Sequence, residues 1–156
     1  MKSQTALFAA GLIVVVIVAC GGDDGVATWT QEGSSMDPTV SHGEQVRIRE
    51  YGSNVPERGD IVLYISLFQR SDTPERNFLK RVVGLPGETV EVRGQEVLID
   101  GELLDEPYVH DPPRYTLALM TIPAGHYFLL PDKRNSNFEP ALEPIPSENI
   151  VGYVVE

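Results

Sequence analysis

Cysteine is nearly absent from this chain of 156 residues, in which Cys20 is the only one. A single cysteine excludes an intramolecular disulfide, a Cys-x-x-Cys redox motif and a cysteine-based zinc finger. Histidine is also rare, and His42, His110 and His126 have no metal-ligand spacing. We therefore expect a fold held together by burial and backbone pairing, with no metal ion and no cofactor.

Positive charge is scarce as well. Lys and Arg number 12 against 23 Asp and Glu, which gives a formal net charge of −11. A nucleic-acid-binding protein needs a basic face to meet the phosphate backbone. The composition therefore argues against a nucleic-acid partner, and the length suits one domain with a hydrophobic core of its own.

No hydrophobic run in the sequence is long enough for an ordinary membrane helix. The longest covers residues 6–19, follows the single charge of Lys2 and ends before a Gly-Gly-Asp-Asp stretch. A membrane-spanning helix needs about 20 apolar residues, whereas the apolar region of a signal peptide is shorter. The sequence thus predicts that residues 1–19 are a signal peptide or a short membrane anchor.

Cys20 stands directly after this run. Residues 17–20, Ile-Val-Ala-Cys, resemble the bacterial lipobox, in which a small residue precedes a cysteine that becomes lipidated. The resemblance implies cleavage before Cys20 and a diacylglycerol group on its sulfur, so that acyl chains form the anchor. An uncleaved short anchor is the alternative. Both place the rest of the chain at the extracytoplasmic face of the plasma membrane, after a linker at residues 20–30.

Helix signals are poor after residue 30, where twelve prolines are scattered and no long stretch keeps a helical period. Short apolar or alternating runs bounded by turn residues predict strands instead. Asp100 and Gly101, between two such runs, are typical of a tight hairpin turn. These signals predict one mainly β domain over residues 31–156, with strands at residues 45–49, 60–65, 78–83, 89–93, 97–99, 102–104, 126–130 and 150–155.

Ser35 is the candidate nucleophile. It lies in the stretch Gly-Ser-Ser-Met-Asp-Pro-Thr at residues 33–39, where Pro38 restricts the residue before it and Gly33 permits close approach of a substrate backbone. A serine hydroxyl reacts only with a base within hydrogen-bond reach. Taken alone, the motif also fits an ordinary loop with Met36 as a core residue.

Lys80 is the candidate base. On a strand it shares one face with Phe78, while Leu79 and Arg81 share the other. Desolvation on an inward face lowers the pKa of a lysine, and a neutral amine can accept the proton of Ser35. A lysine that extends its amine into water is the alternative. A Ser-His-Asp triad stays open, although no spacing indicates one.

Several blocks of sequence occur in a recognisable order. They are Ser-Met-Asp-Pro-Thr at residues 35–39, Arg-Gly-Asp-Ile-Val at 58–62, Leu-Lys-Arg-Val-Val-Gly-Leu-Pro-Gly-Glu at 79–88, Pro-Ala-Gly-His-Tyr-Phe-Leu at 123–129 and Pro-Ser-Glu-Asn-Ile-Val-Gly at 146–152. Together they resemble the blocks of bacterial type I signal peptidases, membrane-bound serine proteases of the S26 family that remove signal peptides from exported proteins. The resemblance covers roughly residues 30–154.

The resemblance implies a mainly β catalytic domain of antiparallel sheets that form a partly open, barrel-like structure. It makes Ser35 the nucleophile and Lys80 the general base, with the backbone N–H of Ser35 in the oxyanion hole. Ser136 matches a hydroxyl that orients the lysine. Gly33 stands where some members carry an oxyanion-hole hydroxyl, which this chain lacks.

The resemblance also implies how a substrate is held. An extended peptide pairs with strand edges and places small residues, such as Ala, in two shallow pockets. Met36, Phe78 and Leu79 match positions that line this cleft, and Gly33 lies beside it.

The last family block departs from the pattern. Residues 131–140 read Pro-Asp-Lys-Arg-Asn-Ser-Asn-Phe-Glu-Pro, which keeps Asp132, Arg134 and Ser136 but lacks the later Asp-Ser-Arg. The ion-pair network of the family is therefore left without its later partners here.

These observations predict a membrane-tethered monomer that removes signal peptides from exported preproteins by a Ser/Lys dyad. The altered last block motivates an alternative, a catalytically impaired lipoprotein that binds exported peptides or a partner on the same scaffold. A self-cleaving transcriptional repressor also uses Ser/Lys chemistry, but the acidic charge and the lack of a leading helix-turn-helix argue against it.

Overall fold

The computed structural model describes residues 25–66, 77–135 and 142–155. Within these ranges the chain forms strands and one 3-10 turn, η1 (Ser147–Asn149), and no α-helix. The mainly β prediction is confirmed. The strands are β1 (Val26–Thr30), β2 (Gln45–Arg49), β3 (Ile61–Ile65), β4 (Asn77–Gly84), β5 (Thr89–Arg93), β6 (Glu96–Ile99), β7 (Glu102–Leu103), β8 (Leu117–Thr121), β9 (His126–Leu130), β10 (Ile145–Pro146) and β11 (Ile150–Val155).

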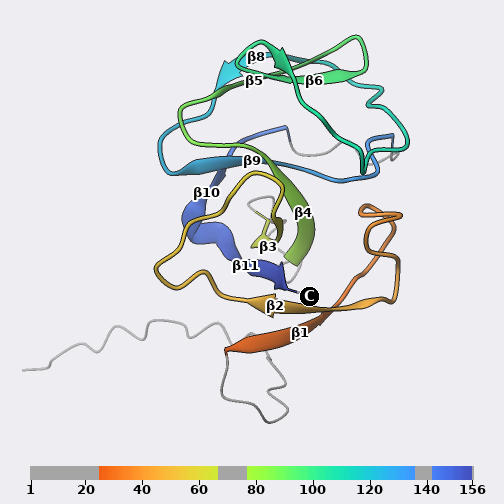
Figure 1. Ribbon diagram of the computed structural model, residues 1–156, viewed down its shortest axis with the longest axis vertical. Coiled ribbons are helices and arrows are strands. Elements are labelled where there is room, and N and C mark those ends of the chain that lie inside the picture. Colours follow the sequence, from red (N-terminus) through yellow and green to blue (C-terminus); the bar gives the residue numbers. More distant parts are fainter. Residues whose placement is uncertain (1–24, 67–76, 136–141, 156) are drawn as a thin grey trace, which may run out of the picture.

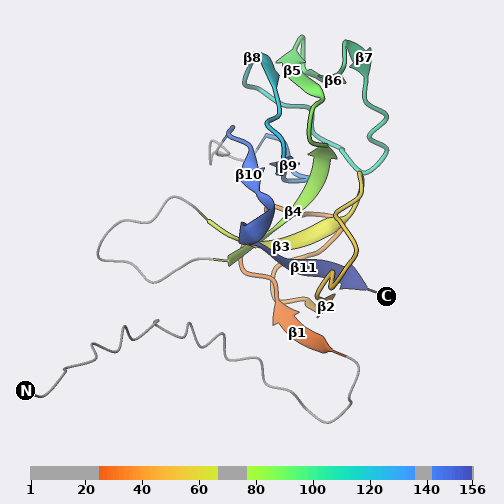
Figure 2. The same ribbon diagram turned by 90° about the vertical axis from the view of Figure 1, so that its left-hand side faces the viewer.

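Two antiparallel sheets make up the described structure. The larger has the strand order β1-β2-β11-β3-β4-β9-β10, and the smaller has the order β7-β6-β5-β8. Figure 1 shows the small sheet at one end of the molecule and the large sheet curling below it. Long strand β4 runs from the large sheet toward the small one, and the turned view of Figure 2 shows that β5 follows it there.

The burial of each strand follows from its place in its sheet. Strand β2 alternates, with Val46 and Ile48 inward and charged residues outward, as a strand with one solvated face should. Strand β3 lies between β11 and β4, and its three middle residues are all buried. In the small sheet, Asp100 and Gly101 connect β6 to β7 with φ values of +51° and +81°, which matches the predicted tight hairpin.

The core consists of three packed clusters. One lies between the small sheet and β9, and another fills the large sheet around Val62 and Val82. The third joins Met36 to Leu79 on β4 and to residues of β2 and β3. This third cluster fixes the segment after residue 33 against β4.

Strand β1 differs from the prediction of a linker over residues 20–30. Residues Val26–Thr30 pair in continuous register with β2, from Val26 opposite Arg49 to Thr30 opposite Gln45. The reason is composition, because the Gly- and Asp-rich stretch ends at Gly25 and β-branched and aromatic residues follow. Trp29 also packs against the cluster that holds Met36.

Three sequence predictions fall outside the described residues. They concern the signal segment at residues 1–19, the lipidation site Cys20 and the orienting hydroxyl Ser136. Within the described ranges, none of the chain is a helix long and apolar enough to cross a membrane.

Candidate active site

Ser35 and Lys80 lie side by side although 45 positions separate them in the sequence. The Nζ of Lys80 donates a hydrogen bond to the Oγ of Ser35 at 3.0 Å. Lys80 is on β4, opposite Val62 of β3, and Ser35 is in the segment between β1 and β2. The structure therefore brings the predicted nucleophile and the predicted base within proton-transfer distance.

Local bonds hold Ser35 in place. The N–H of Asp37 donates to the carbonyl of Ser34 at 3.2 Å, and the N–H of Val40 donates to that of Met36 at 3.0 Å. Met36 is fully buried. From the far side, the N–H of Lys133 donates to the carbonyl of Ser35 at 3.0 Å. The turn that carries Ser35 is thus fixed by the buried side chain of Met36 and by the backbone hydrogen bond from Lys133.

Burial tunes Lys80 toward the neutral form. Desolvation lowers the pKa of Lys80 from 10.5 to about 8, and the negative charge of Asp132 opposes part of that shift. The amine lies 5.8 Å from the centre of the Phe78 ring, which contributes to its apolar surroundings. A measurable fraction of Lys80 is therefore neutral near physiological pH and able to accept a proton.

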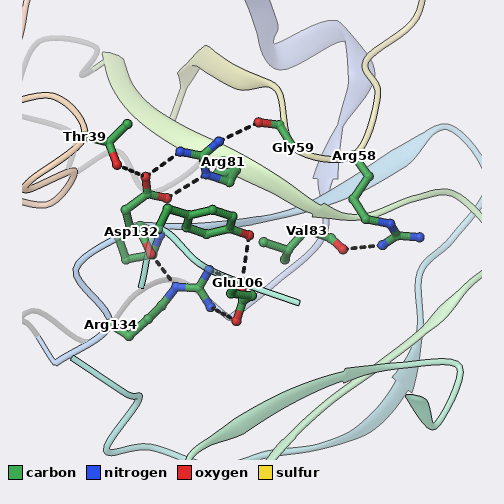
Figure 3. A network of polar contacts seen from close by, with 10 residues as sticks. Thr39, Arg58, Gly59, Arg81, Val83, Glu106, Asp132 and Arg134 are labelled. Carbon is green, nitrogen blue, oxygen red and sulfur yellow. Dashed lines mark hydrogen bonds and ion pairs between the residues drawn. The ribbon is translucent and has the colours of Figure 1, made fainter. Parts of the chain in front are cut away.

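An ion pair forms between Arg81, the neighbour of Lys80 on β4, and Asp132; Figure 3 shows this pair. Arg81 donates from Nε and from a terminal nitrogen to the two carboxylate oxygens of Asp132, at 2.8 and 2.6 Å. Asp132 is fully buried. The hydroxyl of Thr39 donates to the same carboxylate at 2.5 Å, and Arg81 also donates to the carbonyl of Gly59 at 2.7 Å. Asp132 thus connects the nucleophile segment to the strand that carries Lys80.

Arg81 remains charged in this setting. Burial lowers the pKa of Arg81, but the hydrogen bonds and charge of Asp132 outweigh that effect and raise it above its ordinary value. The guanidinium also lies over the ring of Tyr108, 3.9 Å from its centre.

A second buried pair extends the network toward the small sheet. Arg134 donates to both carboxylate oxygens of Glu106, at 2.5 and 3.2 Å, and to the carbonyl of Pro131. The hydroxyl of Tyr108 donates to Glu106 at 3.0 Å. Asp132 and Arg134, two of the residues that the altered last block keeps, are therefore both buried and both paired.

Two family blocks also bond to each other. Arg58 donates to the carbonyl of Val83 and to the carboxylate of Glu88, each at 2.5 Å. The second carboxylate oxygen of Glu88 accepts from the N–H of Leu85 at 2.7 Å. These bonds fix the turn at the end of β4.

The predicted substrate-contacting residues differ in exposure. Gly33 is exposed and Phe78 is half-buried. Met36 and Leu79 are 0% and 1% exposed and pack in one core cluster, so their side chains lie beneath the surface in this structure.

An open hollow adjoins the nucleophile segment. Its volume is about 280 Å³, and it begins at Asp37, two positions after Ser35. Its other lining residues include His110, Asp111, the buried Asp132 and the half-buried Lys133. In the described part of the chain, no group of three or more His, Cys, Asp or Glu side chains could hold a metal ion.

The role of Arg81 and Asp132 is what sequence reasoning missed. The sequence marks Asp132 only as a residue kept in the last block, and Arg81 only as a charged neighbour of Lys80. Their pairing joins positions 51 apart. The available signal was Arg81 itself, because a charge beside a buried strand residue needs a partner.

Comparison with known proteins points in one direction. The family model described as signal peptidase, peptidase S26, matches residues 3–156. A signal peptidase I of Leptolyngbya laminosa is 37% identical over 127 residues, which cover 78% of this chain and 63% of the relative. A signal peptidase IB of Staphylococcus aureus is 30% identical over 163 residues, with 91% of this chain and 82% of the relative covered.

A solved structure matches the same family. The crystal structure of a signal peptidase I from Enterococcus faecalis matches with a TM-score of 0.51 and 25% identity, over 64% of this chain and 97% of that chain. The chain spans less than two thirds of the Leptolyngbya relative and of a Synechocystis probable signal peptidase I-1, of which 65% is covered.

Proposed function

The chain belongs to the signal peptidase family, peptidase S26, and from that membership we propose that it is a serine endopeptidase that removes signal peptides from exported preproteins. The observation that carries the proposal is the 3.0 Å contact between the Ser35 hydroxyl and the Lys80 amine, whose pKa burial lowers to about 8. A nucleophile in contact with a partly neutral base is what amide cleavage requires.

The reaction proceeds in two halves. Ser35 Oγ attacks the carbonyl carbon of the scissile peptide while Lys80 Nζ takes the hydroxyl proton. The peptide C–N bond then breaks, Lys80 returns the proton to the leaving amine, and an acyl-enzyme ester remains on Ser35. Water attacks the ester while Lys80 takes one of its protons, the ester C–O bond breaks, and Lys80 gives that proton to Ser35 Oγ, which releases the cleaved signal peptide and restores the hydroxyl.

We propose that the N–H of Ser35 donates to the oxyanion, with Ser136 as the hydroxyl that orients Lys80. Gly33 supplies no hydroxyl to the oxyanion, and the absence of one donor costs a few kcal/mol of transition-state stabilisation, about 3 kcal/mol in a comparable protease site.

Substrate binding follows from the surfaces near the dyad. We propose that an extended peptide passes Gly33 and Phe78, with Met36 and Leu79 as the buried support beneath its two small side chains. Supporting this, Met36 and Leu79 share one core cluster, so the residue next to the nucleophile and the residue next to the base pack in the same part of the core. The hollow at Asp37 and His110 offers room for chain beyond the cleavage site.

We propose that residues 1–19 target the protein to the membrane and that lipid on Cys20 holds it, as a monomer, at the extracytoplasmic face. The location fits the substrate, because a signal peptide remains in the bilayer while its cleavage site lies just outside it.

The test is cleavage of a preprotein with Ala at the first and third positions before the cut. Ser35→Ala and Lys80→Ala should each abolish turnover, since the first removes the nucleophile and the second its base. Circular dichroism should show that both variants keep the wild-type β spectrum. Full activity in either variant would overturn the assignment, and binding without cleavage by the wild type would favour the peptide-binding lipoprotein instead.

A further inference from the structure

Gly33 has no side chain of its own to anchor it in the fold. It lies two positions before Ser35 with φ at +83°, and a Cβ added there would meet no atom within 4 Å. A positive φ of this kind favours glycine. Because no side chain wedges Gly33 against the fold, the orientation of its peptide groups depends on hydrogen bonds.

Two side chains provide those bonds. The N–H of Gly33 donates to Nδ1 of His42 at 2.9 Å. The carbonyl of Gly33 accepts from Nε2 of Gln31 at 3.3 Å, and Gln31 is 3% exposed. Gly33 is therefore bonded on both of its backbone polar groups, and the shorter bond is the one that His42, seven positions after Ser35 in the sequence, accepts.

The turn that carries His42 is itself fixed. The N–H of Gln31 donates to the carbonyl of Glu44 at 2.8 Å, and the N–H of Gly43 donates to the carbonyl of Gln31 at 2.9 Å. These bonds continue the β1–β2 ladder one step past its last pair, Thr30 and Gln45. Two residues after Gln31 the backbone ladder has ended, and there the N–H of Gly33 donates to the side chain of His42 instead.

The Glu44 side chain completes the turn. Its carboxylate accepts from the N–H of Ser41 at 2.9 Å, while its own N–H donates to the carbonyl of Ser41 at 3.0 Å. The bonds between Ser41 and Glu44 thus close the turn around His42. Because the backbone of His42 is fixed, its side chain can in turn fix the backbone of Gly33.

We propose that His42 is a positioning residue for the nucleophile. Its Nδ1 accepts from the Gly33 amide and so fixes the backbone that leads into Ser35, whose Oγ contacts Lys80 at 3.0 Å. An accepting Nδ1 requires neutral imidazole with its proton on Nε2. His42 acts through the backbone and not on the reacting atoms. The inference rests on the proposed peptidase function for its kinetic consequence.

The kinetic test compares two substitutions in the full chain, with preprotein cleavage as the assay. His42→Ala removes the acceptor. His42→Asn keeps one, because the Asn Oδ1 stands the same number of bonds from the backbone as Nδ1. Loss of one neutral hydrogen bond corresponds to about a fivefold change. We expect kcat of His42→Ala to fall about that much with KM nearly constant, and His42→Asn to keep most of the wild-type kcat.

Thermal unfolding of both variants separates positioning from stability. If His42→Asn loses as much kcat as His42→Ala, or if kcat of His42→Ala is unchanged, the inference is overturned. A fall in kcat that follows the melting temperature in both variants would also overturn it, since a merely structural role predicts that pattern.

A spectroscopic measurement tests the bond without reference to catalysis. Nitrogen-15 spectra of the imidazoles in the wild-type chain, assigned by comparison with His42→Asn, should show Nδ1 of His42 unprotonated at pH 8. A protonated Nδ1 at that pH would refute the bond. If the wild type cleaves no preprotein, the proposed function fails, and this spectrum alone decides whether His42 holds Gly33.

Discussion

Lys80 links burial to chemistry within one side chain. Its pKa in the folded protein is about 8, whereas the ordinary value is 10.5. Between these values the unfolded chain binds more protons than the folded one, so stability rises as pH increases from about 8 to 10.5. Below pH 8 both states carry the ammonium and the full cost of burying it is present.

This cost predicts that replacing the base stabilises the fold. Lys80→Met keeps the length and apolar stem of the side chain and removes the buried charge. At pH 7 its free energy of unfolding should exceed that of the wild type by roughly 1–3 kcal/mol, a range reduced for the partial exposure of Lys80. Urea denaturation at pH 7 measures the difference.

The pH dependence is the control. Near pH 10 the wild-type lysine is neutral in the folded state, so the advantage of Lys80→Met should shrink. A variant that is less stable than the wild type at pH 7 would contradict the buried-amine account.

At the scale of elements, the ion pair of Arg81 and Asp132 joins the nucleophile segment to β4. Removing one partner of a buried pair costs about 3–5 kcal/mol because the other charge is left uncompensated. Asp132 also raises the pKa of Lys80, in opposition to burial. The network therefore braces the strand that carries the base, and Asp132 offsets part of the effect of burial on its proton affinity.

Asp132→Asn should have two separable effects. Its free energy of unfolding should fall by a few kcal/mol, about 3. In the fraction that remains folded, the pKa of Lys80 should drop, so the ascending limb of kcat against pH should move below its wild-type position near 8. Kinetics over a pH series and urea denaturation measure the two.

Lys133→Met is the matched control. Lys133 pairs with Asp37 at 3.5 Å, and both side chains are about one third exposed (34% and 33%). Loss of this pair should change the free energy of unfolding by less than about 1 kcal/mol and leave the ascending limb of kcat against pH where it is in the wild type. A shift of the limb to higher pH in Asp132→Asn would contradict the assigned role of Asp132.

At the scale of the whole molecule, charge and anchoring must be considered together. A chain with a net charge of −11 gains no attraction from anionic lipid headgroups. We therefore propose that membrane association depends on residues 1–19 and on lipid carried by Cys20. Acyl chains contribute about 0.8 kcal/mol for each buried methylene, independently of salt.

Cys20→Ser should separate the two anchoring hypotheses. We expect the wild type to incorporate radioactive palmitate and to begin at Cys20 by mass spectrometry, and the variant to do neither. High salt should not extract the wild type from membranes. A wild type that takes up no label, or a wild-type N-terminus upstream of residue 20, would favour the uncleaved anchor.

The fold was largely predictable because its strands carry local signals. Alternation in β2, the continuous apolar run of β3 and the Asp-Gly turn after β6 each specify structure within a few residues. Strands β8 and β10 were not predicted, since β8 is a half-exposed edge without alternation and β10 is two residues ending in a proline.

The candidate site was predictable only in part. Ser35 and Lys80 could be found from motifs, and the structure places their side chains in contact. The partners of Asp132 and the bond from Gly33 to His42 could not, because they depend on long-range folding and on one φ value. Local sequence specifies which residues are unusual, whereas tertiary structure specifies what they contact.

Direct titration of the Lys80 amine is the most direct test of the account. The lysines of the chain are Lys2, Lys80 and Lys133, so carbon-13 lysine labelling gives few signals, and Lys80→Met assigns the one that matters. The account predicts a midpoint near pH 8 for Lys80 in the folded protein. A midpoint at the ordinary value of 10.5 would show that the amine is not held neutral beside Ser35, and would contradict the dyad.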